Sequence, residues 1–449
     1  MRAYQYRPLR AVLRACGVFS LLGTAPMAVA QTPHGASTAA ERVQRDIEFL
    51  ASDRLEGRLT GSAGNDSAAA FIAQRAASLG LRPLAVDTTA PGCRAMPALD
   101  RCRGYFQKFM ARGVEMVRSG HPEGVPAQNV VAMIPGSDPA LRGQYVVVGA
   151  HYDHLGRSTT GALDPELRNV IRNGADDNAS GTAAVMELAR AFAARPANRS
   201  IIVVAFSGEE LGLLGSQYFV EHAPVAIDSI DAMVNFDMIG RLRNDRLIVY
   251  GVATAKELAG IVDSANAATR LAVSAVGDGF GASDHSSFYA KGIPVLHFFT
   301  DIHEDYHRAS DHADKINAAG EARVLAMAEW AVRNIADRPG RLTPVRVTAP
   351  ATVASSREGI AAYLGSIPDM AAGDTPGLRL SGVRAGSPAD VGGLQAGDVI
   401  VEFGGAVVKD LYAYSAAMKQ HKPGDAVRIV YTRAGVRHDT TVTLGARPQ

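Results

Sequence analysis

The sequence predicts an α/β fold, a mostly parallel twisted sheet with helices on both faces, followed by a small β-rich domain. Two patterns predict it. Between about residues 40 and 337, nearly continuous apolar strands alternate with amphipathic helices, which is typical of a parallel sheet covered on both sides. A stretch rich in Pro, Thr and Ser follows, and beyond it the pattern predicts short Gly-rich strands and one helix. At about 150 residues per domain, the 449 residues provide for two or three domains.

The elements of the large unit, residues 31–340, follow from hydrophobic spacing. Val43, Ile47 and Leu50 repeat at helical spacing, and a second amphipathic run ends at Gly80, a typical helix C-cap. The expected helices are two within 42–80, then 182–194 and 319–335, and the expected strands are 129–134, 145–150, 201–206, 232–236, 247–250 and 294–299.

A linker at residues 341–356 separates this unit from the small one. Residues 336–356 contain three prolines, several Thr and Ser and few bulky apolar groups. Residues 357–449 then read as one compact β-rich domain. Its expected strands are 377–383, 398–403, 426–431 and 439–444, and its expected helix is 411–420.

The composition excludes several classes of protein. With 46 Lys+Arg against 45 Asp+Glu and 47% hydrophobic residues, the chain is neither disordered in character nor basic enough for a nucleic-acid binder. Its three cysteines are too few for a disulfide scaffold and lack zinc-finger spacing. Any metal must therefore be bound by histidines and carboxylates.

Residues 1–30 have the pattern of a secretory signal peptide. Four arginines precede or flank the apolar run at 15–22, and Ala28-Val29-Ala30 provides a small-x-small cleavage site. No run in the chain reaches the roughly 18 apolar residues of a membrane-spanning helix. We therefore expect an exported protein, periplasmic or extracellular, with no membrane span.

Export would leave two cysteines, Cys93 and Cys102, in the mature chain. In an oxidising compartment a local disulfide between them is the favoured expectation. The alternative is two free thiols in a loop.

Acidic and histidine side chains gather where predicted strands end. Because the carboxyl ends of parallel strands meet at one edge of a sheet, where ligands bind in open α/β folds, we expect these side chains to converge. The groups are His151-Tyr152-Asp153 after 145–150, Glu209-Glu210 after 201–206, Asp237 after 232–236, His307 past 294–299, and Asp176-Asp177-Asn178 directly before the helix at 182–194.

Each group alone has an ordinary structural explanation, such as a solvated turn or a loop cap. As a set, two histidines and three carboxylates can bind two neighbouring divalent cations that share one carboxylate, and this donor chemistry suits zinc. Glu209 and Glu210 are adjacent, so one can bind metal while the other accepts a proton from water.

A second zinc-like pattern, His303-Glu304-Asp305-Tyr306-His307, is literally H-E-x-x-H. That motif requires both histidines one turn apart on a helix. Here the preceding residues are strand-like and the following ones show no amphipathic pattern, so we expect the match to be accidental. Of this segment only His307 is expected to bind metal.

Five motifs in fixed order resemble the secreted co-catalytic dizinc aminopeptidases, a superfamily that also holds carboxypeptidases and glutaminyl cyclases. The resemblance covers about residues 40–337 and implies a zinc-exopeptidase fold. The motifs are Gly149-Ala150-His151-Tyr152-Asp153, Gly174-Ala175-Asp176-Asp177-Asn178-Ala179-Ser180-Gly181, Gly208-Glu209-Glu210-Leu211-Gly212-Leu213-Leu214-Gly215-Ser216, Asn235-Phe236-Asp237-Met238-Ile239-Gly240 and Asp305-Tyr306-His307, supported by Ser283-Asp284-His285 and Glu56-Gly57-Arg58.

The resemblance implies a role for each matching residue. His151 and Asp237 would bind one Zn²⁺, Glu210 and His307 the other, and Asp177 would bridge both. Glu209 would be the general base, Asp153 would orient His151, and Tyr306 would hydrogen-bond the developing oxyanion. The implied substrates are peptides with a free N-terminus.

The C-terminal unit resembles a PDZ domain over about residues 357–447. The most specific match is Gly393-Leu394-Gln395-Ala396-Gly397-Asp398, and Tyr363-Leu364-Gly365 is the candidate loop for a peptide carboxylate. Such domains add a C-terminal peptide to a sheet edge. The alternative is a packing domain that binds nothing.

Three further alternatives stay open at this stage. The enzyme could be a carboxypeptidase or a glutaminyl cyclase of the same superfamily, or the chain could be a non-catalytic binding relative. The presence of all five ligands and of Glu209 favours an enzyme.

The sequence leaves the structure of residues 157–171 open. This segment, between the first two metal motifs, could form a lid or an ordinary loop.

Overall fold

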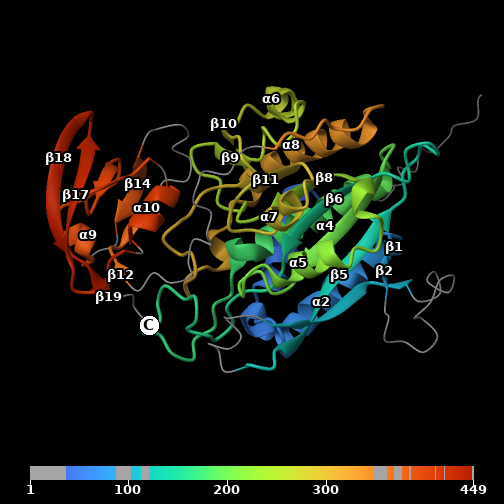
Figure 1. Cartoon of the computed structure of the whole chain (residues 1–449). Coiled ribbons are helices and arrows are strands. Elements are labelled where there is room, and N and C mark those ends of the chain that lie inside the picture. The colour runs from blue at the N-terminus through green and yellow to red at the C-terminus, as the bar shows by residue number, and fades with distance from the viewer. Residues whose placement is uncertain are drawn as a thin grey trace, which may run out of the picture. The chain divides into compact units, whose positions relative to one another are not determined.

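The computed structural model describes residues 37–86, 103–112, 121–346, 362–368, 377–383, 386–409, 411–418 and 420–446 (Figure 1). The predicted signal peptide, the pair Cys93 and Cys102, and residues 347–356 of the predicted linker lie outside these ranges.

The larger part is built on a nine-stranded sheet with the order β1-β5-β7-β6-β8-β11-β9-β10, in which β4 also pairs with β5. At its centre, β7, β6, β8 and β11 run parallel to one another. The strands are β1 (Arg82–Pro83), β4 (Phe106–Ala111), β5 (Val125–Ile134), β6 (Tyr145–His151), β7 (Ser200–Phe206), β8 (Ile230–Phe236), β9 (Arg246–Tyr250), β10 (Ala272–Val276) and β11 (Val295–Phe299), with a separate pair β2 (Ala85–Val86) and β3 (Arg103–Gly104).

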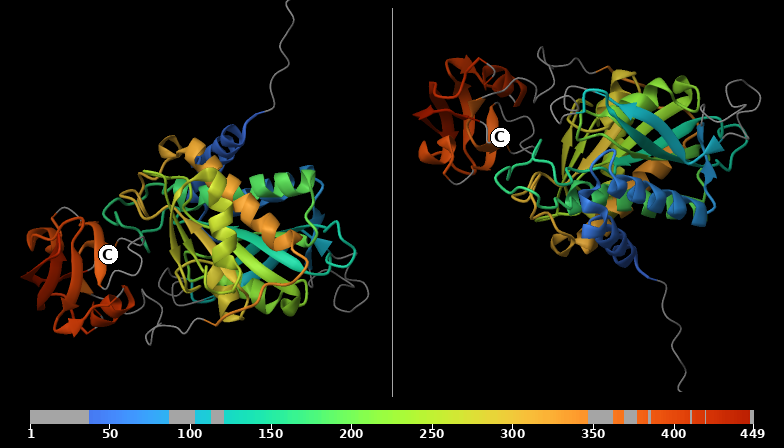
Figure 2. Two further views of the ribbon diagram at one scale, coloured as in Figure 1. Left: turned by 90° about the horizontal axis from the view of Figure 1, so that it is seen from above. Right: turned by 90° about the horizontal axis from the view of Figure 1, so that it is seen from below.

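Helices cover both faces of this sheet, which Figure 2 shows from two further directions. Alternate side chains of β6 separate the two cores: Val146 and Val148 pack with α1, α2, α4, α6 and α8, whereas Val147 packs with α5 and α7. The helices are α1 (Ala39–Leu50), α2 (Ala63–Ser78), α4 (Gly181–Ala194), α5 (Leu214–Glu221), α6 (Leu258–Thr269), α7 (His285–Ala290) and α8 (Ala318–Asp337).

Local sequence accounts for where these helices begin. Thr38 accepts a hydrogen bond from the Glu41 N–H, and the Glu41 side chain accepts one from the Thr38 N–H, so α1 starts in a complete capping box. At the start of α2, the Ser62 side chain accepts a hydrogen bond from the Asn65 N–H. At the start of α4, a Cβ on Gly181 would lie 2.4 Å from the Phe236 carbonyl oxygen, so only glycine fits between that helix and β8.

The smaller part has its own core, formed around Leu380, Ile400, Phe403 and Ile429. Its main sheet has the order β13-β14-β15-β17-β18, with β16 on β15. The elements are β12 (Ala362–Tyr363), β13 (Ser366–Pro368), β14 (Leu378–Val383), α9 (Pro388–Val391), β15 (Val399–Phe403), β16 (Ala406–Val407), α10 (Leu411–Met418), β17 (Ala426–Arg433), β18 (Val436–Thr443) and β19 (Gly445–Ala446).

The predicted mixed α/β architecture with a β-rich C-terminal part is confirmed. Each expected strand and helix has a counterpart within a few residues. The hydrophobic pattern did not predict β4, β10, α5, α6 or α7. Among the described residues, no helix combines the length and the apolar composition that a membrane crossing requires.

Candidate metal centre

The five predicted metal ligands and Glu209 converge at the carboxyl ends of the four central parallel strands. His151 is the last residue of β6, and Asp237 directly follows β8. Glu209 and Glu210 lie in the turn after β7, which is the neighbour of β6 in the sheet. His307 lies beyond β11, and Asp177 lies in the distorted helical turn that precedes α4. The expectation that strand ends bring them together is therefore met by the geometry.

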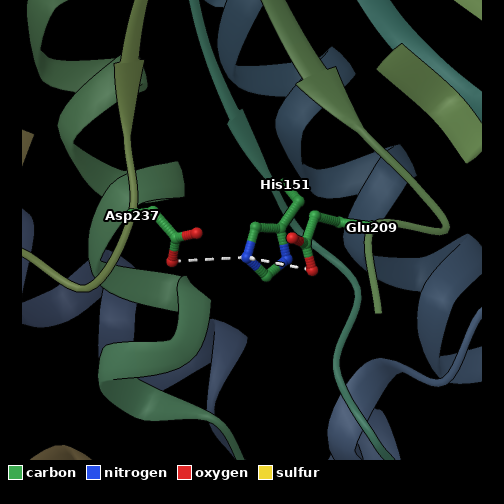
Figure 3. A group of neighbouring side chains, drawn as sticks. All are labelled: His151, Glu209 and Asp237. Carbon is green, nitrogen blue, oxygen red and sulfur yellow. Dashed lines mark ion pairs between the residues drawn. The ribbon is translucent and has the colours of Figure 1, made fainter. Parts of the chain in front are cut away.

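One half of the centre is formed by His151, Asp177 and Asp237, and Figure 3 shows His151 and Asp237 of these three. His151 Nε2 lies 3.4 Å from Asp177 Oδ1 and 3.4 Å from Asp237 Oδ1. Figure 3 shows Glu209 on the other side of the His151 ring, with its Oε2 at 3.9 Å from Nε2. Ser283 Oγ donates to Asp237 Oδ2 at 2.7 Å, so only Oδ1 of that carboxylate faces the centre without a hydrogen bond.

The other half is formed by Asp177, Glu210 and His307. His307 Nε2 lies 3.1 Å from Asp177 Oδ2 and 3.1 Å from Glu210 Oε2. Asp177 therefore directs one carboxylate oxygen to each half, as a bridging ligand must. Its main-chain N–H, together with that of Asp176, donates to Asp311 Oδ2, which anchors the turn.

These separations fit zinc. Two ligand atoms at about 2.0–2.1 Å from a tetrahedral zinc ion lie about 3.3 Å from each other. The four distances from His151 Nε2 and His307 Nε2 to the carboxylate oxygens that face them, of 3.1 to 3.4 Å, are close to that value. Asp237 Oδ1 is buried and has no hydrogen-bond partner, which is costly unless a cation or proton faces it. Imidazole and carboxylate are also the donors that zinc accepts.

The charges in the centre shift the pKa values of its side chains. Burial lowers the pKa of His151, but the charges of Glu209 and Asp237 outweigh it and raise that pKa well above its usual value. Burial also lowers the pKa of His307, but the charge of Glu210 outweighs burial, so the pKa of His307 lies well above its usual value. Burial raises the pKa of Glu209 well above normal, and Glu210 adds to that effect. The protein thus holds protons on its imidazoles that a bound cation would have to displace.

Asp153, predicted to orient His151, lies beside it but acts through its main chain. His151 Nδ1 contacts the Asp153 carbonyl oxygen at 3.2 Å, whereas the nearest carboxylate oxygen is 3.7 Å away. A carbonyl can only accept, so Nδ1 carries the hydrogen and Nε2 is free to face the centre. The Asp153 carboxylate instead accepts from the Glu209 N–H and from Thr60 Oγ1, and so supports the turn that carries Glu209.

The H-E-x-x-H match is accidental in geometry, as expected. Residues 303–307 form turns and no helix, and Glu304 is exposed. The two histidines face different carboxylates, since His303 Nε2 contacts Asp176 Oδ2 at 3.1 Å while His307 faces Asp177 and Glu210. Tyr306 stacks on the His307 ring at a centroid distance of 3.9 Å, which places it at the rim of the centre.

His154 is a residue that the sequence reasoning missed. It is fully buried, and its Nδ1 lies 2.8 Å from Glu210 Oε1. With Asp177 and Glu210 it forms a group that could hold an ion. However, 2.8 Å is a hydrogen-bond distance, shorter than the separation of two zinc ligands. His154 therefore donates to Glu210 and leaves Oε2 of that carboxylate directed at His307. Its position directly after His151-Tyr152-Asp153 was the available signal.

Comparison with known proteins identifies both parts of the chain. Residues 129–331 match the model of Peptidase family M28, and residues 362–444 match that of a PDZ domain. The larger part is a peptidase family M28 domain. The suspected resemblance to zinc metallopeptidases and to PDZ domains is thereby confirmed.

Two curated relatives illustrate the match. Leupeptin-inactivating enzyme 1 of Streptomyces exfoliatus is 33% identical over 195 residues, which cover 43% of this chain and 40% of that protein. Aminopeptidase YwaD of Bacillus subtilis is 29% identical over 185 residues, covering 38% and 37% respectively. The chain thus spans less than half the length of these relatives.

Two solved structures share the fold of the M28 domain. A zinc aminopeptidase from Bacillus subtilis has a TM-score of 0.51 at 16% identity, covering 67% of this chain and 95% of its own. A glutaminyl cyclase from Porphyromonas gingivalis also reaches 0.51, at 17% identity over 66% and 98%. The fold is therefore shared equally with a peptidase and a cyclase, and only the residues of the site can distinguish the two activities.

The predicted carboxylate loop of the PDZ domain, Tyr363-Leu364-Gly365, connects β12 to β13. Gly365 has a φ of +84°, and a Cβ there would lie 2.2 Å from Ser387 Cβ. Only glycine satisfies both the backbone angle and the space. Directly after this loop, Ser366 is the first residue of β13. Its Oγ lies 2.9 Å from the hydroxyl of Tyr414 in α10.

Proposed function

We propose that the protein is an exported dizinc aminopeptidase, which removes N-terminal residues from peptides and binds a C-terminal peptide at its PDZ domain. The observation that carries the dizinc proposal is the position of Asp177. Its two oxygens face His151 and His307 at 3.4 and 3.1 Å, so one carboxylate serves both halves of the centre. Export is proposed from the signal-like pattern of residues 1–30.

In this proposal the bound zinc ions would polarise the scissile carbonyl and lower the pKa of a water molecule. His151 and Asp237 would bind one ion, Glu210 and His307 the other, with Asp177 between them. Glu209 lies beside His151 without being needed as a ligand, and the contact of its main chain with Asp153 holds it there. It would take the proton of the attacking water and deliver it to the leaving amine.

Tyr306 is proposed to stabilise the oxyanion that develops on the substrate. Its ring stacks on His307, which places the residue next to one metal position. A phenol hydroxyl directed at the developing charge would add to the stabilisation that a cation gives. The carboxylates of the centre would also attract a free N-terminal ammonium group, which favours an aminopeptidase over a carboxypeptidase.

A glutaminyl cyclase is the second candidate because the fold is shared equally with one. The complete ligand set on both sides of Asp177 favours two metal ions and therefore the peptidase. Hydrolysis of free aminoacyl anilides, but not of N-blocked ones or of carboxypeptidase substrates, is the result expected. Cleavage of blocked substrates alone, or cyclisation of N-terminal glutamine without hydrolysis, would contradict the proposal.

Replacement of the proposed base tests the mechanism. Glu209→Gln keeps the size of the side chain but cannot accept the proton, so we expect kcat to fall roughly 10²- to 10⁴-fold with the zinc content unchanged. The matched control is Glu304→Gln, which changes an exposed glutamate of the H-E-x-x-H segment and should leave kcat near that of the unaltered protein. Comparable turnover in Glu209→Gln would remove Glu209 as the base.

A further inference from the structure

We propose that residues 156–172 are a fixed strap that positions His307 for metal binding, with Asp164 as the residue that fastens it. The proposal rests on the dizinc centre proposed above. The sequence left open whether this segment is a lid or an ordinary loop. Its two ends, Gly156 and Arg172, pair with each other in an isolated antiparallel bridge, so the strap starts and finishes at one place.

The strap sets the state of the His307 ring. His307 Nδ1 lies 2.8 Å from the carbonyl oxygen of Gly161, which can only accept a hydrogen bond. Nδ1 therefore carries a hydrogen, and Nε2 is the ring nitrogen that faces Asp177 and Glu210. Hydrogen bonds of this kind fix both the tautomer and the direction of a metal-binding histidine.

The strap also holds the main chain of His307. This residue has a φ of +54°, in the left-handed region that a residue with a side chain adopts only when its surroundings require it. Its carbonyl oxygen accepts a hydrogen bond of 2.9 Å from the Leu163 N–H. Two residues on, the Ala309 N–H donates to Asp164 Oδ2 at 2.7 Å. The strap thus makes hydrogen bonds both to the His307 ring and to the main chain of the unfavourable turn.

Asp164 connects the His307 segment to the buried side chain of Arg172. Its Oδ1 accepts from Arg172 Nε at 2.7 Å, while its Oδ2 accepts from Ala309. The Arg172 side chain is fully buried and also donates to the carbonyl oxygens of Ser158, Asp164 and Leu167. One carboxylate therefore ties the closed strap to the His307 segment, which makes Asp164 a positioning residue for the metal ligand.

The test is zinc binding by the full chain. Metal-free protein is titrated with zinc chloride against a chelator of known affinity, and the unaltered protein should bind two ions. Asp164→Asn keeps the size of the side chain but replaces one acceptor oxygen by an NH₂ group. We expect one of the two zinc affinities to fall about 10-fold or more, and the other to stay unchanged. Saturating zinc should restore kcat, which a general folding defect would not allow.

Two further variants separate the strap from simple charge effects. Glu166→Gln removes the same charge from an exposed position of the strap and should leave both affinities unchanged. Arg172→Gln makes the region more negative, so charge alone would tighten zinc binding, whereas loss of the strap weakens one site.

Unchanged affinities in Asp164→Asn would overturn the strap, as would tighter binding in a folded Arg172→Gln protein. An equal loss at both sites, with a lowered unfolding midpoint of the metal-free protein, would also overturn it. Fewer than two ions in the unaltered protein would instead overturn the dizinc centre, and the strap with it.

Discussion

At the scale of single residues, the centre depends on groups that the motifs do not include. The sequence predicted the five ligands and Glu209, because ligand chemistry and strand ends are visible in the chain itself. It did not predict His154 behind Glu210 or Asp164 behind His307, and it included Ser283 only in a supporting motif, without a role behind Asp237. These residues act through hydrogen bonds that exist only after distant segments have packed together. The position of His154 directly after the His151 motif was a signal, but spacing along the chain does not reveal the partners of these residues.

Glu321, in the first turn of α8, gives a prediction for pH dependence. It is fully buried, and neither carboxylate oxygen has a hydrogen-bond partner. Burial, and secondarily the charge of Asp176, raises its pKa well above the usual value. The folded protein therefore keeps a proton that the unfolded chain releases near pH 4.3, so this group lowers stability as the pH rises above that point, by up to about 1.4 kcal/mol per pH unit.

Glu321→Gln removes this titration. We expect the free energy of unfolding of the variant, relative to the unaltered protein, to increase between pH 5 and pH 7 in urea denaturation. Glu329→Gln, on the same helix and less buried, serves as the control and should show a much smaller change. A difference between Glu321→Gln and the unaltered protein that does not vary with pH would contradict the assigned protonation.

At the scale of elements, strong periodicity decided what the sequence could predict. The strands β6, β7 and β8 are almost entirely buried and mostly apolar, and both the strands and their ends were expected. The edge strand β4, with the sequence FQKFMA, and the helix α6, interrupted by Gly260, have weaker patterns. Their positions are set by pairing with β5 and packing against α8, which are tertiary effects.

Arg58 joins several elements around the centre. Its buried guanidinium donates to the carbonyl oxygens of Tyr152, Leu50, Asn173 and Gly174, which belong to the end of β6, the end of α1 and the loop before Asp177. Burial lowers its pKa to about 10, so it stays charged at neutral pH.

Arg58→Met would leave those carbonyl oxygens buried without donors. We expect the free energy of unfolding to fall by about 3 kcal/mol or more, measured by denaturant titration. Arg54→Met, at an exposed position nearby, should change it by less than about 1 kcal/mol. A loss in Arg58→Met no larger than in the control would show that water or neighbouring groups satisfy the carbonyls.

At the scale of the whole molecule, the chain has separate hydrophobic cores for its M28 and PDZ domains. The sequence predicted this division from the stretch that contains Pro, Thr and Ser and from the short Gly-rich strands that follow it. Separate cores predict two thermal unfolding transitions, because each domain carries its own cooperative unit.

Core substitutions assign the two transitions. Ile400→Ala removes a fully buried side chain of the PDZ core and should lower one midpoint, while Val148→Ala in β6 should lower the other. Calorimetry of both variants measures this directly. A single transition that both substitutions shift equally would show that the domains unfold as one unit.

The central claim is that one carboxylate, Asp177, serves two metal ions. The most direct measurement is the number of zinc ions per chain at which turnover of a free aminoacyl anilide reaches its maximum, found by adding zinc stepwise to the metal-free protein. The account predicts maximal turnover only when two ions are bound. Maximal turnover with a single bound ion, and no increase with a second, would contradict it.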